Sequence, residues 1–242
     1  LHIRDELVEK LLSVRSMNIG VVGALAKVQG LRERPLVEEE VVDATSDGYP
    51  MVAIGSSTGG PAAVQVLLAG LPGDLNAAVA ISQHMPAGFT RSFSERLNKY
   101  SSLTVIEAKD GSVVRPGSVL VAPGGYNLSF ERRDSSTIVA RVELAKDDKF
   151  IPSVDMMFRS ASKIFGSACL GVVLTGMGSD GKVGVRAIKD SGGYVIAQSE
   201  ETSVIFGMPR EAIATGVVDK VLPLEEIAAK ISYRCALLGS AK

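Results

Sequence analysis

From residue 50 onward, short apolar runs alternate with stretches of helical periodicity, and this alternation is the strongest constraint on the fold. Residues 51–54 form the first apolar run, and a helical pattern follows over residues 61–70. The next pair is an apolar run at 77–82 and a helical pattern at 87–99. Runs of this kind are typical of βαβ units around a parallel sheet. The sequence therefore predicts an α/β fold, doubly wound, with a mostly parallel sheet and helices on both faces.

The second half of the chain repeats this pattern. Apolar runs at 169–175 and 194–197 flank a helical pattern at 183–190, which is followed by two glycines. An apolar run at 217–222 and an amphipathic stretch at 224–238 come last. We expect these segments to complete the same domain.

The middle of the chain breaks the rhythm. Four apolar runs alternate there with turn residues, at 103–107, 118–122, 127–132 and 137–143. The connections between them leave no room for crossover helices, which parallel strands usually need. We therefore expect antiparallel hairpins beside the parallel sheet.

Residues 1–48 differ in character from the rest and end in a polar stretch. Ile3, Leu7, Leu11 and Val14 recur at helical spacing, which predicts a short amphipathic helix with one apolar stripe. The stripe could pack against a partner outside this sequence or against the main domain. We expect residues 1–48 to be a linker segment and residues 49–242 to form the main domain.

Composition excludes several classes of partner. The formal net charge is −1, so no overall positive field attracts nucleic acid or an anionic membrane. No apolar run reaches the length of a membrane span, and two cysteines are too few for a disulfide framework. We expect a cytoplasmic protein with no nucleic-acid partner and no membrane insertion.

A glycine-rich segment between the first predicted strand and helix carries the first candidate for chemistry. Gly55-x-Ser57-x-Gly59 has the spacing of a nucleophile elbow, in which glycine neighbours allow a sharp turn that exposes the serine. The same strand-turn-helix arrangement also binds phosphate, although Pro61 stands where a P-loop carries lysine. The motif alone leaves a nucleophile, a phosphate site and a structural turn open.

A serine nucleophile needs a base, and the chain has two histidines. His2 lies near the first residue, whereas His84 follows the second predicted strand. Open α/β sheets place their ligands at the carboxyl ends of the strands, where Ser57 is also expected. His84 is therefore the candidate base, and a capping or surface histidine is the alternative.

Asp180 supplies a third candidate. It lies in Thr-Gly-Met-Gly-Ser-Asp-Gly, residues 175–181, between an apolar run and a helical pattern. An aspartate in this place could orient the imidazole and stabilise its charged form. The alternative is a helix N-cap, for which aspartate is among the preferred residues.

Five spaced segments together resemble one family. Over about residues 50–235 the chain is similar to the catalytic domain of the chemotaxis protein-glutamate methylesterases, the CheB family. The matching segments are Ala-Ile-Gly-Ser-Ser-Thr-Gly-Gly at 53–60, Gln-His-Met-Pro and its continuation at 83–93, Pro-Ser-Val-Asp at 152–155, Leu-Thr-Gly-Met-Gly-Ser-Asp-Gly at 174–181, and Phe-Gly-Met-Pro-Arg-Glu-Ala at 206–212.

The resemblance implies a triad of Ser57, His84 and Asp180, with the backbone of Met177 and Thr58 as oxyanion contacts. It implies hydrolysis of glutamate γ-methyl esters on chemoreceptors with release of methanol, and deamidation of receptor glutamines. We expect no metal or organic cofactor, because an imidazole and two backbone donors suffice for acyl transfer.

The family also carries an N-terminal receiver domain. We expect that domain to be absent from this sequence, with residues 1–48 as its connecting linker and 49–242 as the methylesterase domain.

Two positions depart from the family pattern. Asn127 stands where many members have histidine, and Ile151 stands where many have a basic residue. Both departures leave the triad intact and put details of substrate contact in doubt. The alternative function is a phosphate-binding regulatory module that uses the Gly55 to Gly60 turn without catalysis.

Overall fold

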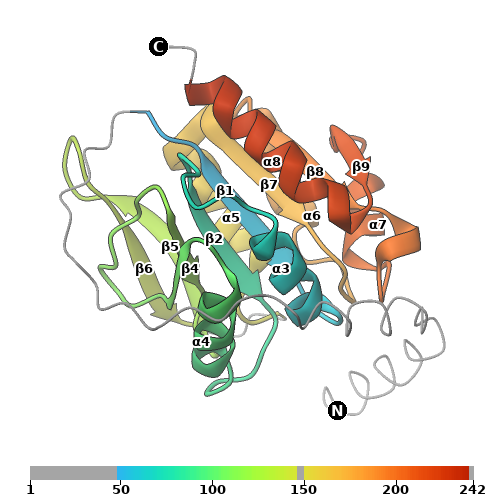
Figure 1. Cartoon of the computed structure of the whole chain (residues 1–242), viewed down its shortest axis with the longest axis horizontal. Coiled ribbons are helices and arrows are strands. Elements are labelled where there is room, and N and C mark those ends of the chain that lie inside the picture. Colours follow the sequence, from blue (N-terminus) through green and yellow to red (C-terminus); the bar gives the residue numbers. More distant parts are fainter. Residues whose placement is uncertain (1–47, 146–149, 240–242) are drawn as a thin grey trace.

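The computed structural model describes residues 48–145 and 150–239. A sheet of seven parallel strands forms its centre, in the order β3-β4-β2-β1-β7-β8-β9 (Figure 1). The strands are β1 (Met51–Ser56), β2 (Ala78–Gln83), β3 (Thr104–Glu107), β4 (Ser118–Val121), β7 (Cys169–Val173), β8 (Tyr194–Gln198) and β9 (Lys220–Leu222). The predicted α/β fold with a mostly parallel sheet is confirmed.

Helices cover both faces of this sheet. One face carries α3 (Gly60–Ala69), α4 (Thr90–Tyr100) and α8 (Leu224–Gly239). The other carries α5 (Val154–Phe165), α6 (Lys182–Asp190) and α7 (Met208–Ile213). The sheet is therefore the middle layer of three, as a doubly wound fold requires.

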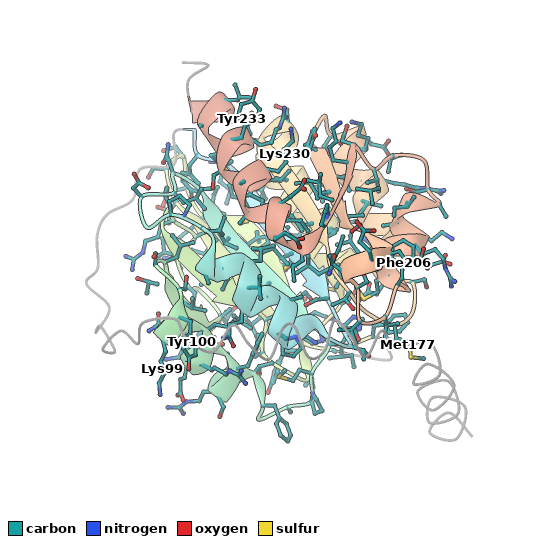
Figure 2. The ribbon with its side chains drawn as sticks, turned by 45° about the vertical axis from the view of Figure 1, so that its right-hand side comes forward. Lys99, Tyr100, Met177, Phe206, Lys230 and Tyr233 are labelled. Atoms are coloured by element: carbon teal, nitrogen blue, oxygen red, sulfur yellow. The ribbon has the colours of Figure 1, made fainter. Side chains whose placement is uncertain are left out.

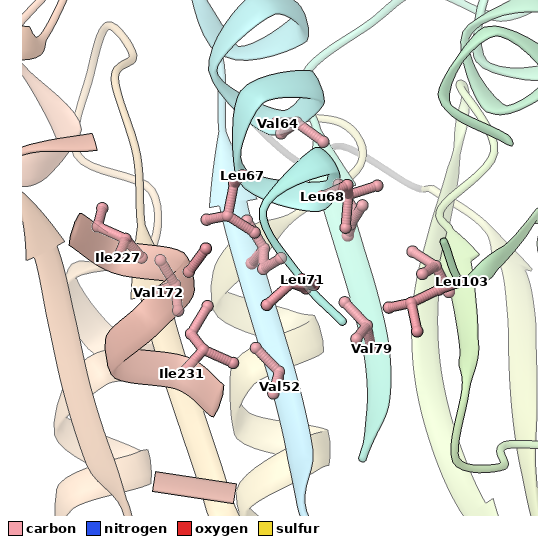
Figure 3. Packing of buried hydrophobic residues seen from close by; sticks show 14 of the residues in the cluster. Val52, Val64, Leu67, Leu68, Leu71, Val79, Leu103, Val172, Ile227 and Ile231 are labelled. Atoms are coloured by element: carbon pink, nitrogen blue, oxygen red, sulfur yellow. The ribbon is translucent and has the colours of Figure 1, made fainter. Parts of the chain in front are cut away.

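The central strand β1 shows why both faces must be covered. Its side chains alternate between the two faces, so that Val52 and Ile54 lie in one core and Met51 and Ala53 in the other. All four are fully buried. Figure 3 shows the first core, where Leu67 of α3 and Leu71 just after it lie over Val52. Ile227 and Ile231 of α8 pack there together with Val172. Each such side chain contributes about 1.5–3 kcal/mol when buried.

The expected antiparallel hairpins are half right. β5 (Tyr126–Arg132) and β6 (Ile138–Leu144) pair antiparallel as a separate two-stranded sheet. The runs at 103–107 and 118–122 instead form β3 and β4, which pair parallel at one edge of the main sheet. The hairpin prediction for these two runs was wrong.

The physical reason lies in the segment that joins β3 to β4. It crosses between parallel strands without a helix, because the β5–β6 hairpin supplies its hydrogen bonds. Val113 forms an antiparallel bridge with Val139, and the Val114 amide donates to the Ile138 carbonyl at 2.9 Å. A crossover supported in this way needs fewer residues than one built around a helix.

The predicted amphipathic helix around residues 3–14 lies outside the described residues, as does nearly all of the predicted linker at 1–48. Among the helices that the structure does describe, none combines the length and apolar character needed to cross a bilayer.

Phe158 of α5 tests how much the second core depends on close packing. It is fully buried, and its Cβ lies only 2.5 Å from where a Cβ on Gly184 would stand. Phe158→Ala should lower the free energy of unfolding by about 3–5 kcal/mol, because it leaves a cavity. Urea unfolding measures this change.

The control is the same substitution at Phe89, whose exposed fraction is 64%. Phe89→Ala should change the free energy of unfolding by less than about 0.5 kcal/mol. Equal losses in the two variants would contradict the packing described here.

Candidate active site

Sheet register brings the predicted site residues to one edge. Ser56 pairs with Gln83 across β1 and β2, so Ser57 and His84 are the next residues beyond adjacent strand ends. β1 also pairs with β7, after which the chain continues through residues 174–179 to Asp180. All three predicted side chains therefore arise where the parallel strands end.

His84 and Asp180 are joined directly. His84 Nε2 lies 2.8 Å from Asp180 Oδ2, with 13% and 2% of the two side chains exposed. Because Nε2 faces the carboxylate, it carries the proton in the neutral ring, and Nδ1 is the nitrogen that can accept one. The expectation that Asp180 meets the imidazole agrees with this geometry.

Asp180 also binds the start of helix α5. Its Oδ2 accepts from the Val154 amide at 2.7 Å and its Oδ1 from the Asp155 amide at 2.9 Å. These are the first two residues of α5, whose amides have no partner within the helix. The positive end of the helix dipole there favours a negative charge.

The alternative interpretation made Asp180 the N-cap of the helix that follows it, α6, and the contacts of that helix differ from this. The N-cap residue of α6 is Gly181, which has no side chain to cap the helix. Asp155 of α5 does this instead, since its Oδ1 accepts from the Gly184 amide at 2.6 Å. The two helices thus exchange caps: Asp180 precedes α6 and adds to the cap that Ser153 gives α5, while Asp155 belongs to α5 and caps α6.

Burial raises the pKa of Asp155, and the negative charge of Asp180 raises it further, while amide donors such as Gly184 oppose the rise. Two carboxyl groups therefore share the junction of α5 and α6. The environment of Asp155 disfavours its ionised form, whereas Asp180 faces two helix amides and an imidazole.

Ser57 stands on a tight turn fixed by its neighbours. Gly59 has φ 82°, a left-handed conformation that residues with a Cβ rarely adopt. A Cβ on Gly60 would lie 2.1 Å from Gln83 Oε1, so only glycine fits there. The Ser57 amide donates to the Thr175 carbonyl at 3.1 Å. The turn is therefore held against both adjacent strand ends.

Ser57 and His84 are neighbours without a direct hydrogen bond among the interactions of the described residues. The imidazole and the carboxylate are the members of the predicted triad that the structure joins. Catalytic hydrogen bonds are often loose without substrate and tighten when it binds.

The two predicted oxyanion contacts have free amides. Within residues 48–145 and 150–239, neither the Thr58 amide nor the Met177 amide donates a hydrogen bond. A Cβ on Gly176, which precedes Met177, would lie 2.9 Å from both the Ser57 amide nitrogen and the Ser57 Cβ. The Met177 turn therefore lies directly against the serine.

Apolar side chains flank this turn. Phe206 lies beside Gly176, through a parallel bridge between their backbones. Figure 2 shows Met177 and Phe206 on the right-hand side of the molecule, away from Tyr233 of α8 at the top. The edge of the sheet that carries Ser57 is therefore partly apolar on the side of β7 and β8.

Sequence reasoning missed an aromatic contact to the histidine. Phe150 stacks on the His84 ring, with ring centroids 5.2 Å apart and planes at 4°. Its ring also lies near Gly178, where a Cβ would approach it to 3.0 Å. Phe150 directly precedes Ile151, so it lies outside the family motif, which begins at residue 152.

Asn127, the other departure from the family pattern, lies inside the protein. It is 3% exposed, and its Oδ1 accepts from the Ser153 amide at 2.8 Å. Ser153 caps α5 and precedes Val154, which donates to Asp180. Asn127 therefore supports the segment that holds Asp180, and its side chain is not on the outer surface.

The cysteines are poor candidates for a nucleophile. Cys169 and Cys235 are buried and free. Burial raises the pKa of the Cys169 thiol to about 12 and that of Cys235 to about 11. Neither forms the thiolate that reactivity requires near neutral pH. Within the described ranges, no three His, Cys, Asp or Glu side chains gather as a metal site would need.

Comparison with known proteins gives a consistent result. A family model described as CheB methylesterase matches residues 52–231. A protein-glutamate methylesterase/protein-glutamine glutaminase of Geobacter sulfurreducens is 56% identical over 189 residues, which cover 78% of this chain and 51% of that protein. A relative of the same description from Myxococcus xanthus is 44% identical over 228 residues, which cover 93% of this chain and 62% of that protein.

The structure is similar to the crystal structure of the Thermotoga maritima CheB methylesterase catalytic domain. The TM-score is 0.74 at 40% identity, and the match covers 76% of this chain and 98% of that one. The chain spans about half the length of the curated relatives it matches.

The exchanged caps make stability depend on pH through Asp155. Its raised pKa means that the folded state keeps the proton to a higher pH than the unfolded state. Stability therefore falls as pH rises from the unfolded value through the folded one. Asp155→Asn keeps an acceptor for the Gly184 amide and has no proton to lose.

The free energy of unfolding of Asp155→Asn, relative to the unchanged protein, should therefore increase between about pH 4 and about pH 7. Urea unfolding at the two pH values measures it. A difference that is the same at both would contradict the assignment.

Proposed function

This chain belongs to the CheB methylesterase family, and on that basis we propose that it is a serine hydrolase that removes methyl groups from glutamate γ-methyl esters of chemoreceptors. The observation that carries the proposal is the hydrogen bond between His84 and the buried Asp180, one strand end away from Ser57. A base oriented by a carboxylate beside a serine on a sharp turn is the arrangement that acyl transfer needs.

In the first half of the proposed reaction, Ser57 Oγ attacks the γ-carbonyl carbon while His84 Nδ1 accepts the hydroxyl proton. Asp180 stabilises the imidazolium through Nε2. The Thr58 and Met177 amides donate to the oxygen on which negative charge develops. The tetrahedral intermediate then expels methoxide, which takes the proton from Nδ1 and leaves as methanol.

In the second half, the glutamyl ester on Ser57 is hydrolysed. His84 Nδ1 accepts a proton from water as the water oxygen attacks the ester carbon. The intermediate collapses with cleavage of the bond to Ser57 Oγ, which recovers the proton from Nδ1. A free glutamate and the unchanged enzyme result.

The same residues suit deamidation of a receptor glutamine. The attack by Ser57 gives an equivalent tetrahedral intermediate, from which ammonia leaves after taking the proton from Nδ1. The relatives' names pair the two activities, as methylesterase and glutaminase. We include deamidation in the proposal for this chain.

The phosphate-binding alternative is less well supported by the start of α3. Phosphate sites at helix N-termini use free backbone amides. Here the Gly60 amide already donates to the Ser57 carbonyl at 2.8 Å, and Pro61 has no amide proton. Much of the donor set that an anion would need is absent or occupied.

The wider setting follows from the family. We propose that residues 49–242 form the methylesterase domain and that residues 1–48 are the linker to a receiver domain. The partners would be the cytoplasmic helices of chemoreceptors, which places the reaction in the cytoplasm. The activity would serve adaptation in chemotaxis.

Methanol release from methylated receptor membranes tests the proposal. Ser57→Ala should reduce the release on the order of 10⁴-fold or more, because the covalent intermediate cannot form. Ser232→Ala is the matched control, since Ser232 lies on α8 and donates to the Ala228 carbonyl. It should leave the rate unchanged. Undiminished release from Ser57→Ala would refute the assignment.

Covalent labelling by a fluorophosphonate separates a hydrolase from a binding module. The unchanged protein should be labelled at Ser57, because only an activated serine reacts. Asp180→Asn should be labelled more slowly and Ser57→Ala not at all, since members of a triad contribute unequally. Intact-mass measurement over time records each rate. Absence of labelling in the unchanged protein would favour the phosphate-binding alternative.

A further inference from the structure

The buried side chain of Gln83 lies between the backbones of the proposed nucleophile and base. It is 2% exposed and ends β2, directly before His84. Its Nε2 donates to the Ser57 carbonyl at 3.0 Å and to the His84 carbonyl at 2.9 Å. Its Oε1 accepts from the Ser56 hydroxyl at 2.7 Å. The side-chain amide of Gln83 therefore forms hydrogen bonds with residues at the ends of both β1 and β2.

The orientation of this amide is fixed by its partners. Two of them are backbone carbonyl oxygens, which can only accept, so the NH₂ group must face them. A Cβ on Gly60 would lie 2.1 Å from Oε1, so the side chain occupies a space that the adjacent glycine leaves free. Both amide protons and one oxygen lone pair are thereby used inside the protein.

Two donors hold the Ser57 carbonyl. One is Gln83 Nε2, and the other is the Gly60 amide at 2.8 Å. The Ser57 carbonyl and the Thr58 amide belong to a single peptide group, which is planar and trans. Fixing the carbonyl in one direction therefore turns the Thr58 N–H in the opposite direction, away from Gln83.

The second proposed oxyanion contact is built in the same way. The Gly176 carbonyl accepts from the Gly207 amide at 3.1 Å and from the Met208 amide at 2.8 Å. The Met177 N–H lies on the other side of that trans peptide. Both free amides of the site thus belong to peptides whose carbonyls are held by two donors, and Gln83 is the one donor of the four that comes from a side chain.

We propose that Gln83 is a positioning residue for the reaction, whose side-chain amide orients the Ser57–Thr58 peptide so that the Thr58 N–H meets the developing oxyanion. The proposal rests on the proposed serine hydrolase chemistry and adds a residue to it. Gln83 touches no reacting atom. It acts through the Thr58 N–H, whose value to catalysis depends on being aimed before charge develops.

The proposal predicts where the effect of Gln83 appears in the kinetics. Loss of a donor that acts only on the developing oxyanion lowers the rate of the chemical step and leaves initial binding unchanged. Loss of a complete oxyanion donor costs about 10²–10³-fold in rate, and the Gly60 amide still holds the Ser57 carbonyl when Gln83 is replaced. We therefore expect a loss of about 10-fold to 10²-fold.

Phosphonylation of Ser57 by a fluorophosphonate measures this step without the natural substrate. In Gln83→Met, which keeps the side-chain length and lacks the donors, the maximal labelling rate should fall by about 10-fold to 10²-fold at unchanged half-saturating concentration. The pH dependence of labelling should keep its midpoint, because His84 and Asp180 remain paired. A shifted midpoint would mean that Gln83 acts through His84 and would overturn the proposal.

Ser56→Ala is the matched control. It removes the partner of Gln83 Oε1, which leaves one buried polar atom unpaired while both Nε2 hydrogen bonds remain. Its melting temperature should fall about as far as that of Gln83→Met, and its labelling rate should stay within about twofold of the unchanged protein. An equal rate loss in both variants would show that Gln83 has a structural role alone.

A second variant keeps the test decisive if Gln83→Met does not fold. Gln83→Glu retains an acceptor for Ser56 and offers at most one proton to two carbonyls, so its labelling rate should fall below that of the unchanged protein. An unchanged rate in Gln83→Glu or Gln83→Met overturns the proposal. Absence of Ser57 labelling in the unchanged protein would overturn the proposal as well. If labelling is normal but no methanol is released from receptor membranes, only the proposed receptor substrate is refuted.

Discussion

The hydrogen bonding of one carboxylate, that of Asp180, connects the packing of the fold to the chemistry of its edge. Its oxygens accept from the first two amides of α5 and from His84 Nε2. Because the helix amides stabilise the negative charge, the carboxylate can be buried and remain an acceptor for the imidazole. Removing either set of partners would leave a buried charge partly unpaired, so the helix start and the histidine depend on the same group.

The exchange of caps between α5 and α6 extends this dependence into the core. Asp155 holds the Gly184 amide of α6, and Gly184 has no Cβ because Phe158 occupies that space. The two helices are therefore fixed in register by polar contacts at their starts and by close packing one turn later. The position of Asp180 follows from that register. The geometry of the His84–Asp180 pair is a consequence of how α5 packs on α6, in addition to the sheet topology.

Much of this arrangement could be predicted from the sequence, for a physical reason. Parallel strands all present their carboxyl ends at one edge, so identifying the strands before Ser57, His84 and Asp180 was enough to place the three segments together. The β3 and β4 pairing could not be read in this way, since its crossover takes its hydrogen bonds from a hairpin far along the chain. Strand direction there depends on a tertiary contact that no local pattern records.

Residues that act on the site indirectly could not be identified from the sequence either, because their roles also depend on tertiary contacts. Gln83 lies inside a motif that the sequence had already singled out, yet its role depends on which carbonyls face its amide after the strands pair in register. Asn127 supports Asp180 through Ser153 and Val154, across two elements that are distant in sequence.

A side chain that bears chemistry is recognisable by its type and its place at a strand end. A side chain that aims a backbone amide is a common polar residue whose function is set by the direction of a peptide plane. The oxyanion contacts of a backbone-lined site are therefore specified by residues other than those that donate the hydrogen bonds, and for the proposed Thr58 contact by the residue that ends β2.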